Sequence, residues 1–448
     1  MGKRQDDNPT HLCLHAPNES VFFFLRFSLH DTRGRIFARC SARSEPPRVP
    51  ARARLALGVL GAPFRVLLSL CCATISLSPC LESTLKRTTC RLFIGVSPGL
   101  EPLLVAEARR NGFLEVKRFE GGAELRTELP GLWTLAHTSR IAESIRLRLQ
   151  RFKAHNFDEL HEQLSKCAWA AYFPRGSKPE VQVVSRRSAL YHTDAVKERA
   201  EATIAARLAG PEGCSAVAEG KIHLRIVNDE VQVSIDTVGE RLHRRGIREH
   251  VGIAPIRETL AAALLAAADL TPEQPMWDPF CGSGTLLLER RLQHQRRLSR
   301  RFAFEAWPIH DQAAYAAFLQ DAPNAIDVPL PSMFGSDIDE HSLDAARSNS
   351  EGMERIRWMS GDFQRHVDEV PEGAGVVSNL PYGKRTTERG IIDTFRRFGA
   401  LLTSRLDLGP VVVLNGHPGF VDATRLTWEP LFSFRNRGLP VQLLRLKR

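Results

Sequence analysis

The residues Ser378–Gly383 combine groups that could hold an amino group attached to an aromatic ring. The side-chain oxygen of Asn379 and the carbonyl of Leu380 offer two neighbouring acceptors, one for each N–H of such an amine. Pro381 stiffens the chain so that this carbonyl keeps its direction, and Tyr382 provides a ring on which a base can stack. An amine on an aromatic ring is a poor nucleophile because its lone pair is delocalised. Two fixed acceptors would turn the nitrogen toward pyramidal geometry and aim its lone pair at an electrophile.

A glycine-containing run about a hundred residues earlier, Trp277–Thr285, supplies a candidate cofactor loop. Gly282 and Gly284 let the backbone pass close to a ligand. The run matches neither the dinucleotide-binding pattern nor the P-loop pattern, so a phosphate cradle is disfavoured. It resembles the loop with which methyltransferases hold S-adenosylmethionine. Residues 379–382 resemble the [NDS]-P-P-[YF] signature of enzymes that methylate an exocyclic amino group on a base.

The expected cofactor contacts lie in this loop and after later strands. We predict cofactor-binding roles for Asp278, Phe280, Gly282, Gly284, Thr285, Asp337, Asp362 and Asn379. Asp278 would orient the methionine end of the cofactor through its ammonium group. An acid at the end of a second strand accepts hydrogen bonds from ribose hydroxyls, which favours Asp337, with helix capping as the alternative. Asp362 would accept the adenine amino group, unless it lies in a surface turn.

These residues need a parallel sheet whose strands end at one edge, where such folds bind ligands. The apolar pattern predicts strands over residues 275–278, 333–336, 356–359, 376–378 and 409–415, then a final pair over 431–437 and 441–447. Helices separate the earlier strands. Seven strands that end in a hairpin match the sheet of class I methyltransferases. We therefore predict this α/β, Rossmann-like fold for residues 241–448.

The preceding part, residues 89–240, alternates short strands and helices. Repeated β–α–β–β units of this length predict an α+β domain of ferredoxin-like type. Residues 190–199 resemble the core of the THUMP domain, an RNA-binding module. We expect phosphate contacts from basic residues near this core and beside the following hinge, namely Arg186, Arg187, Lys197, Arg199, Arg244 and Arg245. A solvated basic helix face, or a basic linker packed against either domain, is the alternative.

Bulk composition adds little to the case for RNA. The net charge is +10, but residues 1–90 carry 13 Lys and Arg against 6 Asp and Glu, so only about +3 belongs to the rest. We interpret residues 1–88 as a disordered or non-native extension, with a targeting segment or a folded addition as alternatives. The apolar run 66–81 is too short and too rich in Ser and Cys for a membrane span.

The cysteines point to a reducing compartment. Six of the nine lie at or before Cys90, and no CxxC pair or Cys/His ligand spacing appears. We therefore expect neither a metal site nor a disulfide framework, and we predict a cytoplasmic protein without membrane contact. A monomer is favoured over an oligomer.

Residues 91–448 resemble the bacterial THUMP-containing 23S rRNA (guanine-N(2)-)-methyltransferases, on the hinge 242–246, the loop 278–285 and the tetrapeptide 379–382. The resemblance implies transfer of a methyl group from S-adenosylmethionine to the 2-amino group of a guanine in RNA, with catalytic positioning by the tetrapeptide. Leu380 replaces the usual first proline. A similar leucine occurs among tRNA-modifying relatives, so a tRNA substrate stays open. Methyl transfer to DNA adenine and a catalytically silent RNA-binding assembly factor are further alternatives.

Overall fold

The computed structural model describes residues 23–28, 37–42, 89–210, 217–245, 256–293, 300–321, 329–382, 388–436 and 438–448. The chain divides into two compact units, Met1–Leu85 and Lys86–Arg448. In the first unit, strands β1 (Phe23–Ser28) and β2 (Phe37–Ala42) form an antiparallel pair. The predicted extension over residues 1–88 otherwise lies outside the described residues.

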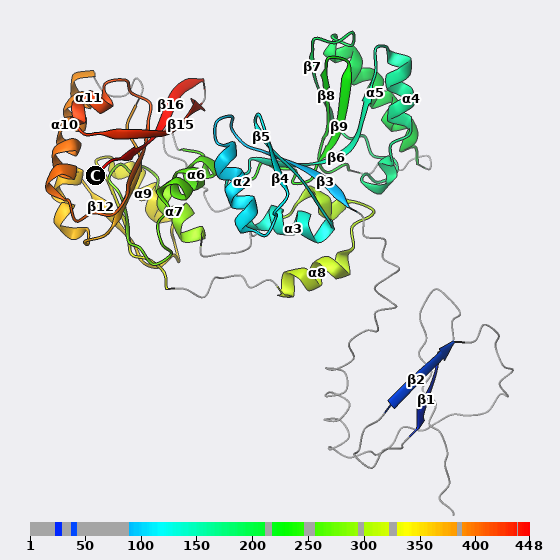
Figure 1. The fold of residues 1–448 in the computed structure, drawn as a ribbon, viewed down its shortest axis with the longest axis horizontal. Helices are drawn as coiled ribbons and strands as arrows, with labels where there is room; N and C mark the ends of the chain where they lie inside the picture. Colours follow the sequence, from blue (N-terminus) through cyan, green and yellow to red (C-terminus); the bar gives the residue numbers. More distant parts are fainter. Residues whose placement is uncertain are drawn as a thin grey trace, which may run out of the picture. The chain divides into compact units, whose positions relative to one another are not determined.

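A seven-stranded sheet forms the N-terminal part of the second unit, coloured from blue to green in Figure 1. Its strand order is β4-β5-β3-β6-β9-β8-β7, and only β7 and β8 run parallel. The strands are β3 (Cys90–Gly95), β4 (Val116–Phe119), β5 (Gly122–Thr127), β6 (Ser144–Lys153), β7 (Val181–Arg186), β8 (Ile222–Val227) and β9 (Glu230–Asp236). The helices are α2 (Glu101–Arg110), α3 (Leu129–Thr138), α4 (Phe157–Ser165) and α5 (Thr193–Arg207), with the 3-10 turn η1 (Trp169–Ala171).

The two faces of this sheet differ because successive side chains of a strand point to opposite sides. Leu92, Leu147 and Leu224 lie on the face that the helices cover, and all three are buried. Their neighbours on the same strands, among them Arg91 and Arg225, belong to the other face. That face carries polar and charged side chains.

The C-terminal part is a second seven-stranded sheet with the order β12-β11-β10-β13-β14-β16-β15. The first five strands are parallel, and β16 is antiparallel to both β14 and β15. The strands are β10 (Met276–Asp278), β11 (Met333–Asp337), β12 (Ile356–Ser360), β13 (Gly375–Asn379), β14 (Val411–Asn415), β15 (Trp428–Asn436) and β16 (Leu439–Leu446). This topology confirms the predicted Rossmann-like fold.

Helices cover both faces of the parallel strands. They are α6 (Glu258–Ala268), α7 (Thr285–Leu292), α9 (Glu340–Asn349), α10 (Glu388–Ser404) and α11 (Phe420–Thr424). Two short 3-10 turns, η3 (Phe363–Arg365) and η4 (Val367–Glu369), follow β12. Burial on both sides explains the two consecutive valines of the central strand β13. Val376 packs into the core that contains α10, and Val377 packs into the core that contains α6 and α7.

The α6–α7 core is continuous with the core of the N-terminal sheet. An insertion before β11, with η2 (Ala303–Ala306) and α8 (Gln312–Asp321), adds to this contact. Within it, the Tyr315 hydroxyl lies 2.8 Å from Nε2 of His137 on α3. The predicted domain boundary at residues 240 and 241 therefore stays a prediction. No helix in the described part of the chain is long and apolar enough to cross a membrane.

Candidate active site

The carboxyl ends of three neighbouring parallel strands bring the predicted site residues to one edge of the second sheet. β10 lies between β11 and β13, and the three strands end at Asp278, Asp337 and Asn379. Residues that are about a hundred positions apart thereby become neighbours: Ser378 Oγ donates a hydrogen bond to Asp278 Oδ1 at 2.5 Å. The strand order thus assembles the site that the spacing predicted.

The glycine-containing loop leaves β10 and is fastened to β11. The amide of Cys281 donates to the Ser336 carbonyl at 3.0 Å, and the amide of Gly282 donates to Asp337 Oδ2 at 2.8 Å. Gly282 has a φ of +52°, and a Cβ added there would meet no atom within 4 Å. The loop therefore presents open space at Gly282, as close approach of a ligand requires.

Gly284 has a packing role in addition to the predicted cofactor contact, which stays a prediction. Its φ is +81°, and an added Cβ would lie 2.4 Å from the Trp358 ring on β12. It also serves as the N-cap of α7, whose first residue Thr285 is buried. Close packing between helix and sheet thus explains this glycine, and Thr285 lies inside the first helical turn.

Asp278 is a buried carboxyl beside the cofactor loop. It is 1% exposed and accepts hydrogen bonds from the Ser378 hydroxyl and, at 3.2 Å, from the Phe280 amide. Burial raises its pKa to about 7 despite these bonds, and the nearby Asp337 raises it further. A cationic ligand at this position would stabilise the ionised form.

This raised pKa predicts that cofactor affinity depends on pH. Below about pH 7 the free protein holds Asp278 protonated, so an ammonium group can pair with it only after a proton leaves. We expect the association constant of S-adenosylmethionine to fall by up to about tenfold per pH unit as the pH drops from roughly 7.5 to 5.5. Calorimetric titration across this range measures the slope. The Asp278→Asn variant should bind more weakly and should lose the pH dependence; a wild-type slope in that variant would contradict the assignment.

Asp337 and its neighbours form the second part of the cofactor edge. The Asp337 carboxylate accepts from the Gly282 amide and, through Oδ1, from the Asp339 amide at 3.0 Å. Burial raises its pKa. Asp339 is the N-cap of α9 and accepts from the Ser342 hydroxyl at 2.6 Å. Asp337 therefore organises the loop already, and its predicted contact with ribose stays a prediction.

Ile338 is a residue that the sequence reasoning missed. It lies between the two aspartates with 78% of its surface exposed, although large aliphatic side chains are usually buried. An apolar residue directly after a strand-terminal acid is the signal that could have found it. We expect Ile338 to pack against the flat purine of the cofactor.

The tetrapeptide 379–382 follows β13 directly. Oδ1 of Asn379 is buried and has no hydrogen-bond partner among the described residues. The amide of Leu380 donates to the Leu414 carbonyl at 3.1 Å, and its side chain is buried, which anchors the turn before Pro381. An orphaned buried acceptor is costly, by roughly 1–3 kcal/mol, so its presence indicates a place where a donor binds.

Two further residues that the sequence reasoning missed position the Tyr382 ring. Asn436, the last residue of β15, donates its Nδ2 to the Tyr382 hydroxyl at 3.1 Å. Gly416 lies against the ring, where an added Cβ would be 2.8 Å from ring carbons. The ring is therefore held at its hydroxyl end and supported at one side by backbone.

This arrangement predicts that Tyr382 and Asn436 act together. The variants Tyr382→Phe and Asn436→Ala each remove one end of the same hydrogen bond, so each should lower kcat/KM by about 2- to 10-fold. The double variant should be no worse than either single variant, because the shared bond is lost only once. Steady-state kinetics of the three variants measures this coupling. Multiplicative losses would show that the two residues act separately.

Asp362 and Phe280 already have partners within the protein. The Asp362 carboxylate pairs with Arg397 at 2.6 Å and accepts from the Gln364 amide at 3.0 Å. Although partial burial raises its pKa, these bonds lower it overall. Phe280 packs edge-to-face with Phe363 at a centroid distance of 5.2 Å. The predicted contacts of both residues with the cofactor stay predictions.

Known proteins are similar to this chain in sequence and in fold. A family model described as RMKL-like, methyltransferase domain, matches residues 245–430. A putative RNA methyltransferase of Synechocystis sp. is 30% identical over 387 residues, which cover 81% of this chain and 98% of that protein. The chain belongs to the RMKL-like methyltransferase family.

One further relative and one solved structure are similar to this RMKL-like methyltransferase over most of its length. The ribosomal RNA large subunit methyltransferase K/L of Saccharophagus degradans is 29% identical over 386 residues, covering 81% of this chain and 51% of that protein. The chain thus spans about half the length of that relative. The crystal structure of a predicted N6-adenine-specific DNA methylase from Listeria monocytogenes is 27% identical, with a TM-score of 0.71, and covers 80% of this chain and 96% of that one.

S-adenosylmethionine is the methyl donor of this RMKL-like methyltransferase. The residues at the sheet edge fit it, because Gly282 leaves open space beside a buried carboxyl and next to an exposed apolar side chain. Asp278, Asp337 and Ile338 are the residues that we expect to hold it. Among the described residues, no three His, Cys, Asp or Glu side chains are grouped so that they could bind a metal ion.

The six predicted RNA contacts of this RMKL-like methyltransferase do not form one surface. Lys197 lies 3.9 Å from Glu201, and the Arg199 guanidinium lies over the Phe157 ring at 5.8 Å, both on α5. Arg186 ends β7, and Arg187 follows it with a φ of +49°. Exposed Arg244 pairs with Glu240 at 2.7 Å. These contacts stay predictions.

The prediction for Arg245 is wrong. Its side chain is 1% exposed, and its Nε donates to Glu289 on α7 at 2.5 Å. Its Nη2 donates to the Arg140 carbonyl at 2.6 Å. A guanidinium enclosed in this way stabilises the packing of α7 against the N-terminal part and is not available to a phosphate.

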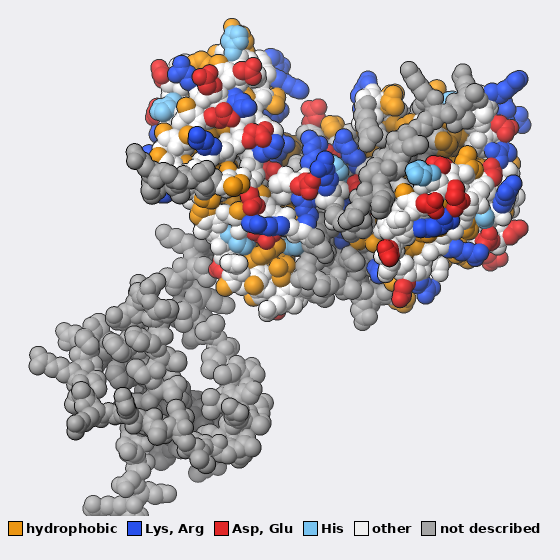
Figure 2. Space-filling model, turned by 180° about the vertical axis from the view of Figure 1, so that it is seen from behind, with side chains coloured by type: hydrophobic (Ala, Val, Ile, Leu, Met, Phe, Trp, Pro, Cys, Tyr) orange, Lys and Arg blue, Asp and Glu red, His pale blue; other side chains and the backbone are white. Residues whose placement is uncertain are grey.

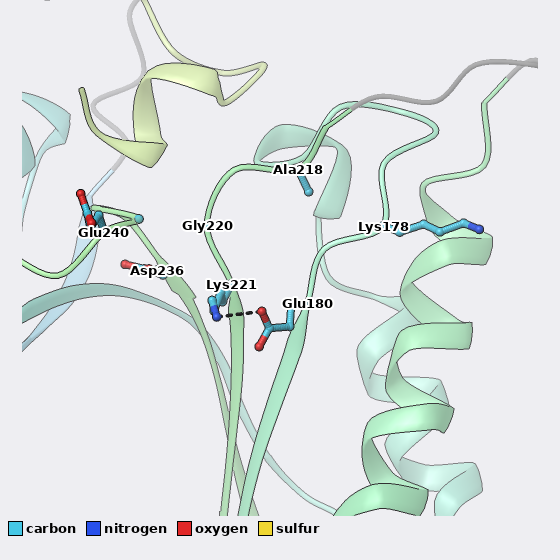
Figure 3. A pocket seen from close by; sticks show the side chains of 8 residues that line it. Lys178, Glu180, Ala218, Gly220, Lys221, Asp236 and Glu240 are labelled. Carbon is cyan, nitrogen blue, oxygen red and sulfur yellow. Dashed lines mark ion pairs between the residues drawn. The ribbon is translucent and has the colours of Figure 1, made fainter. Parts of the chain in front are cut away.

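A polar pocket of about 420 Å³ lies outside this site (Figure 3). Its lining residues come from the starts of β7 and β8 and the end of β9: Lys178, Glu180, Ala218, Gly220, Lys221, Asp236, Gly239 and Glu240. Lys221 pairs with Glu180 at 2.7 Å in this pocket. Because two basic and three acidic side chains are mixed there, the pocket offers a charged ligand a surplus of only one negative charge.

Proposed function

We propose that this methyltransferase transfers a methyl group from S-adenosylmethionine to the 2-amino group of a guanine in RNA, with 23S rRNA as the favoured substrate. The buried Oδ1 of Asn379, which has no hydrogen-bond partner in the described part of the chain, carries this proposal. It supplies an acceptor for an amino N–H next to the Tyr382 ring, on which a base can stack. The names of the Synechocystis and Saccharophagus relatives support RNA, and rRNA in particular.

The chain's own residues position the reacting amine. Asn379 Oδ1 accepts one N–H, and the Leu380 carbonyl accepts the other, so the nitrogen lone pair faces the incoming methyl group. Tyr382, held by Asn436, stacks on the extruded base, which contributes about 1–3 kcal/mol per base. Bound S-adenosylmethionine supplies an electrophilic methyl carbon on a sulfonium.

Electrons and protons balance without a strong general base. The nitrogen lone pair forms the new N–C bond while the C–S bond breaks, and S-adenosylhomocysteine leaves. The nitrogen is then cationic, and one of its protons passes to solvent. Positioning therefore supplies most of the rate enhancement, on the order of several kcal/mol.

Mapping the product tests this function. Purified protein, S-adenosylmethionine with a labelled methyl group, and total RNA from a strain that lacks the gene are incubated together. Digestion to nucleosides and mass spectrometry should then find N2-methylguanosine in large-subunit rRNA. The Asn379→Ala protein is the matched control for contaminating activity.

The other outcomes identify the alternatives. Label in tRNA would support a tRNA guanine methyltransferase, the runner-up. With DNA from the same strain as a parallel substrate, N6-methyladenine in that DNA would favour the activity named for the Listeria structure. Cofactor binding without transfer to any nucleic acid would favour a catalytically silent RNA-binding factor in ribosome assembly.

A further inference from the structure

The polar face of the N-terminal sheet carries a large excess of positive charge. The register of the strands, and the alternation of side chains between the two faces of the sheet, place nine Lys or Arg on this face against three Asp or Glu. The basic side chains include Arg91, Arg126, Arg148, Arg186 and Arg225. Neither the periodicity nor the net charge of the chain reveals this face, because its members come from seven strands.

Only part of this charge is neutralised inside the protein, since Arg151 pairs with Glu230 and Arg146 lies opposite Asp236. Glu124 serves two arginines at once, at 3.7 Å from Arg91 and 3.6 Å from Arg148. Arg126, Arg186 and Arg225 are exposed and have no acidic partner among the described residues. An anion that reaches this face therefore meets cations that are not already paired.

The pKa of Arg148 is consistent with the excess of positive charge on this face. Burial among its neighbours lowers its pKa to about 10, and although Glu124 opposes the shift, the nearby Arg146, Arg91 and Arg225 lower it further. Unneutralised arginines repel one another, and a polyanion would remove this repulsion.

Apolar groups are interleaved with the charges. The Arg148 guanidinium lies over the Phe93 ring at 4.4 Å, and Phe119 and Val184 are 49% and 53% exposed. Rings and guanidinium planes are surfaces on which nucleic-acid bases stack. Figure 2 shows one face of the molecule, with Lys and Arg side chains gathered toward its middle.

We propose that this polar sheet face docks the phosphate backbone of the substrate RNA. The inference rests on the proposed function in so far as RNA is the substrate. Five strand spacings separate β5 from β7, which is about 24 Å, and duplex nucleic acid presents on the order of ten phosphates over that length. Helix α5 carries three basic and three acidic side chains, so it lacks the surplus charge that a polyanion requires.

A charge-removal series tests the sheet face directly. The first protein carries Arg126→Gln, Arg186→Gln and Arg225→Gln. The matched control carries Arg109→Gln, Arg110→Gln and Lys166→Gln, three exposed basic residues at the C-terminal ends of α2 and α4. Both proteins lose the same charge. Binding of a fluorescein-labelled RNA hairpin with a single-stranded tail is followed by anisotropy over a range of salt concentrations.

The sheet variant should bind at least ~10-fold more weakly at low salt, and the slope of log K against log salt should fall by about 2 to 3. The control should keep the wild-type slope. If the triple variant does not fold, Arg225→Gln alone should lower the slope by about 1.

Two results would overturn the assignment. An unchanged salt slope in the sheet variant would mean that this face does not bind RNA, and would favour an acidic protein surface as its partner. A fall in slope that is confined to a Lys197→Gln/Arg199→Gln protein would place the RNA on α5. Failure of the proposed function is separate, because it would show as the absence of N2-methylguanosine in the product assay, whereas the salt slope measures RNA binding alone.

Discussion

Replacing Asn379 with Ala should cut kcat at least ~100-fold, about 2.7 kcal/mol at the transition state, while the affinity for S-adenosylmethionine stays close to that of the wild type. The side-chain oxygen is buried and has no hydrogen-bond partner among the described residues, so loss of this oxygen breaks no hydrogen bond there. The loss falls on the substrate amine, which keeps only the Leu380 carbonyl as an acceptor. Single-turnover rates with RNA, together with calorimetric titration of the cofactor, measure the two quantities.

The Asn379→Asp variant is the matched control for this change. It keeps an oxygen at the same position, so it should retain activity within about tenfold of the wild type, far above Asn379→Ala. Equal loss in both variants would mean that the amide nitrogen or the local fold matters and not the acceptor. Unchanged turnover in Asn379→Ala would remove the central step of the proposed mechanism.

The meeting of the candidate site residues at one sheet edge could be predicted from sequence because its determinants are local. Asp278, Asp337 and Asn379 each end a short strand, and parallel strands of this order end at one edge. The local sequence could not show which contacts those residues make within the free protein. The Gly282 amide donates a hydrogen bond to the Asp337 carboxylate. Gly284 packs so closely against the Trp358 ring on a distant strand that a Cβ would not fit.

Surfaces built from several strands could not be predicted in the same way. Whether a basic residue belongs to the polar sheet face depends on the register of strands far apart in the chain. An irregularity between Arg148 and Gln150 brings Arg151 back to the side of Gln232, and a shift by one residue would reverse the assignment of every following side chain. The two arginines beside the hinge show a similar limit, since Arg244 is exposed whereas its neighbour Arg245 is buried.

Replacing Arg245 with Met should lower the free energy of unfolding by about 3–5 kcal/mol, because Glu289 would be left as a buried, unpaired charge. The Arg140 carbonyl would also lose its donor. The neighbouring Arg244→Met is the matched control. Its ion pair with Glu240 has side chains that are 69% and 55% exposed, so its loss should cost no more than about 1 kcal/mol. Urea denaturation, monitored by tryptophan fluorescence, measures both variants, and equal losses would contradict the buried pair.

The double variant Arg245→Met/Glu289→Leu should recover most of the stability that Arg245→Met loses. One atom on each side, Nη1 of Arg245 and Oε2 of Glu289, has no hydrogen-bond partner among the described residues, and an incompletely satisfied buried pair is often replaced by apolar side chains without net cost. Glu289 lies on α7, the helix that Gly284 caps directly after the cofactor loop. Arg245→Met should therefore weaken cofactor binding as well, and the double variant should restore it, since apolar packing can hold α7 in place of the charges.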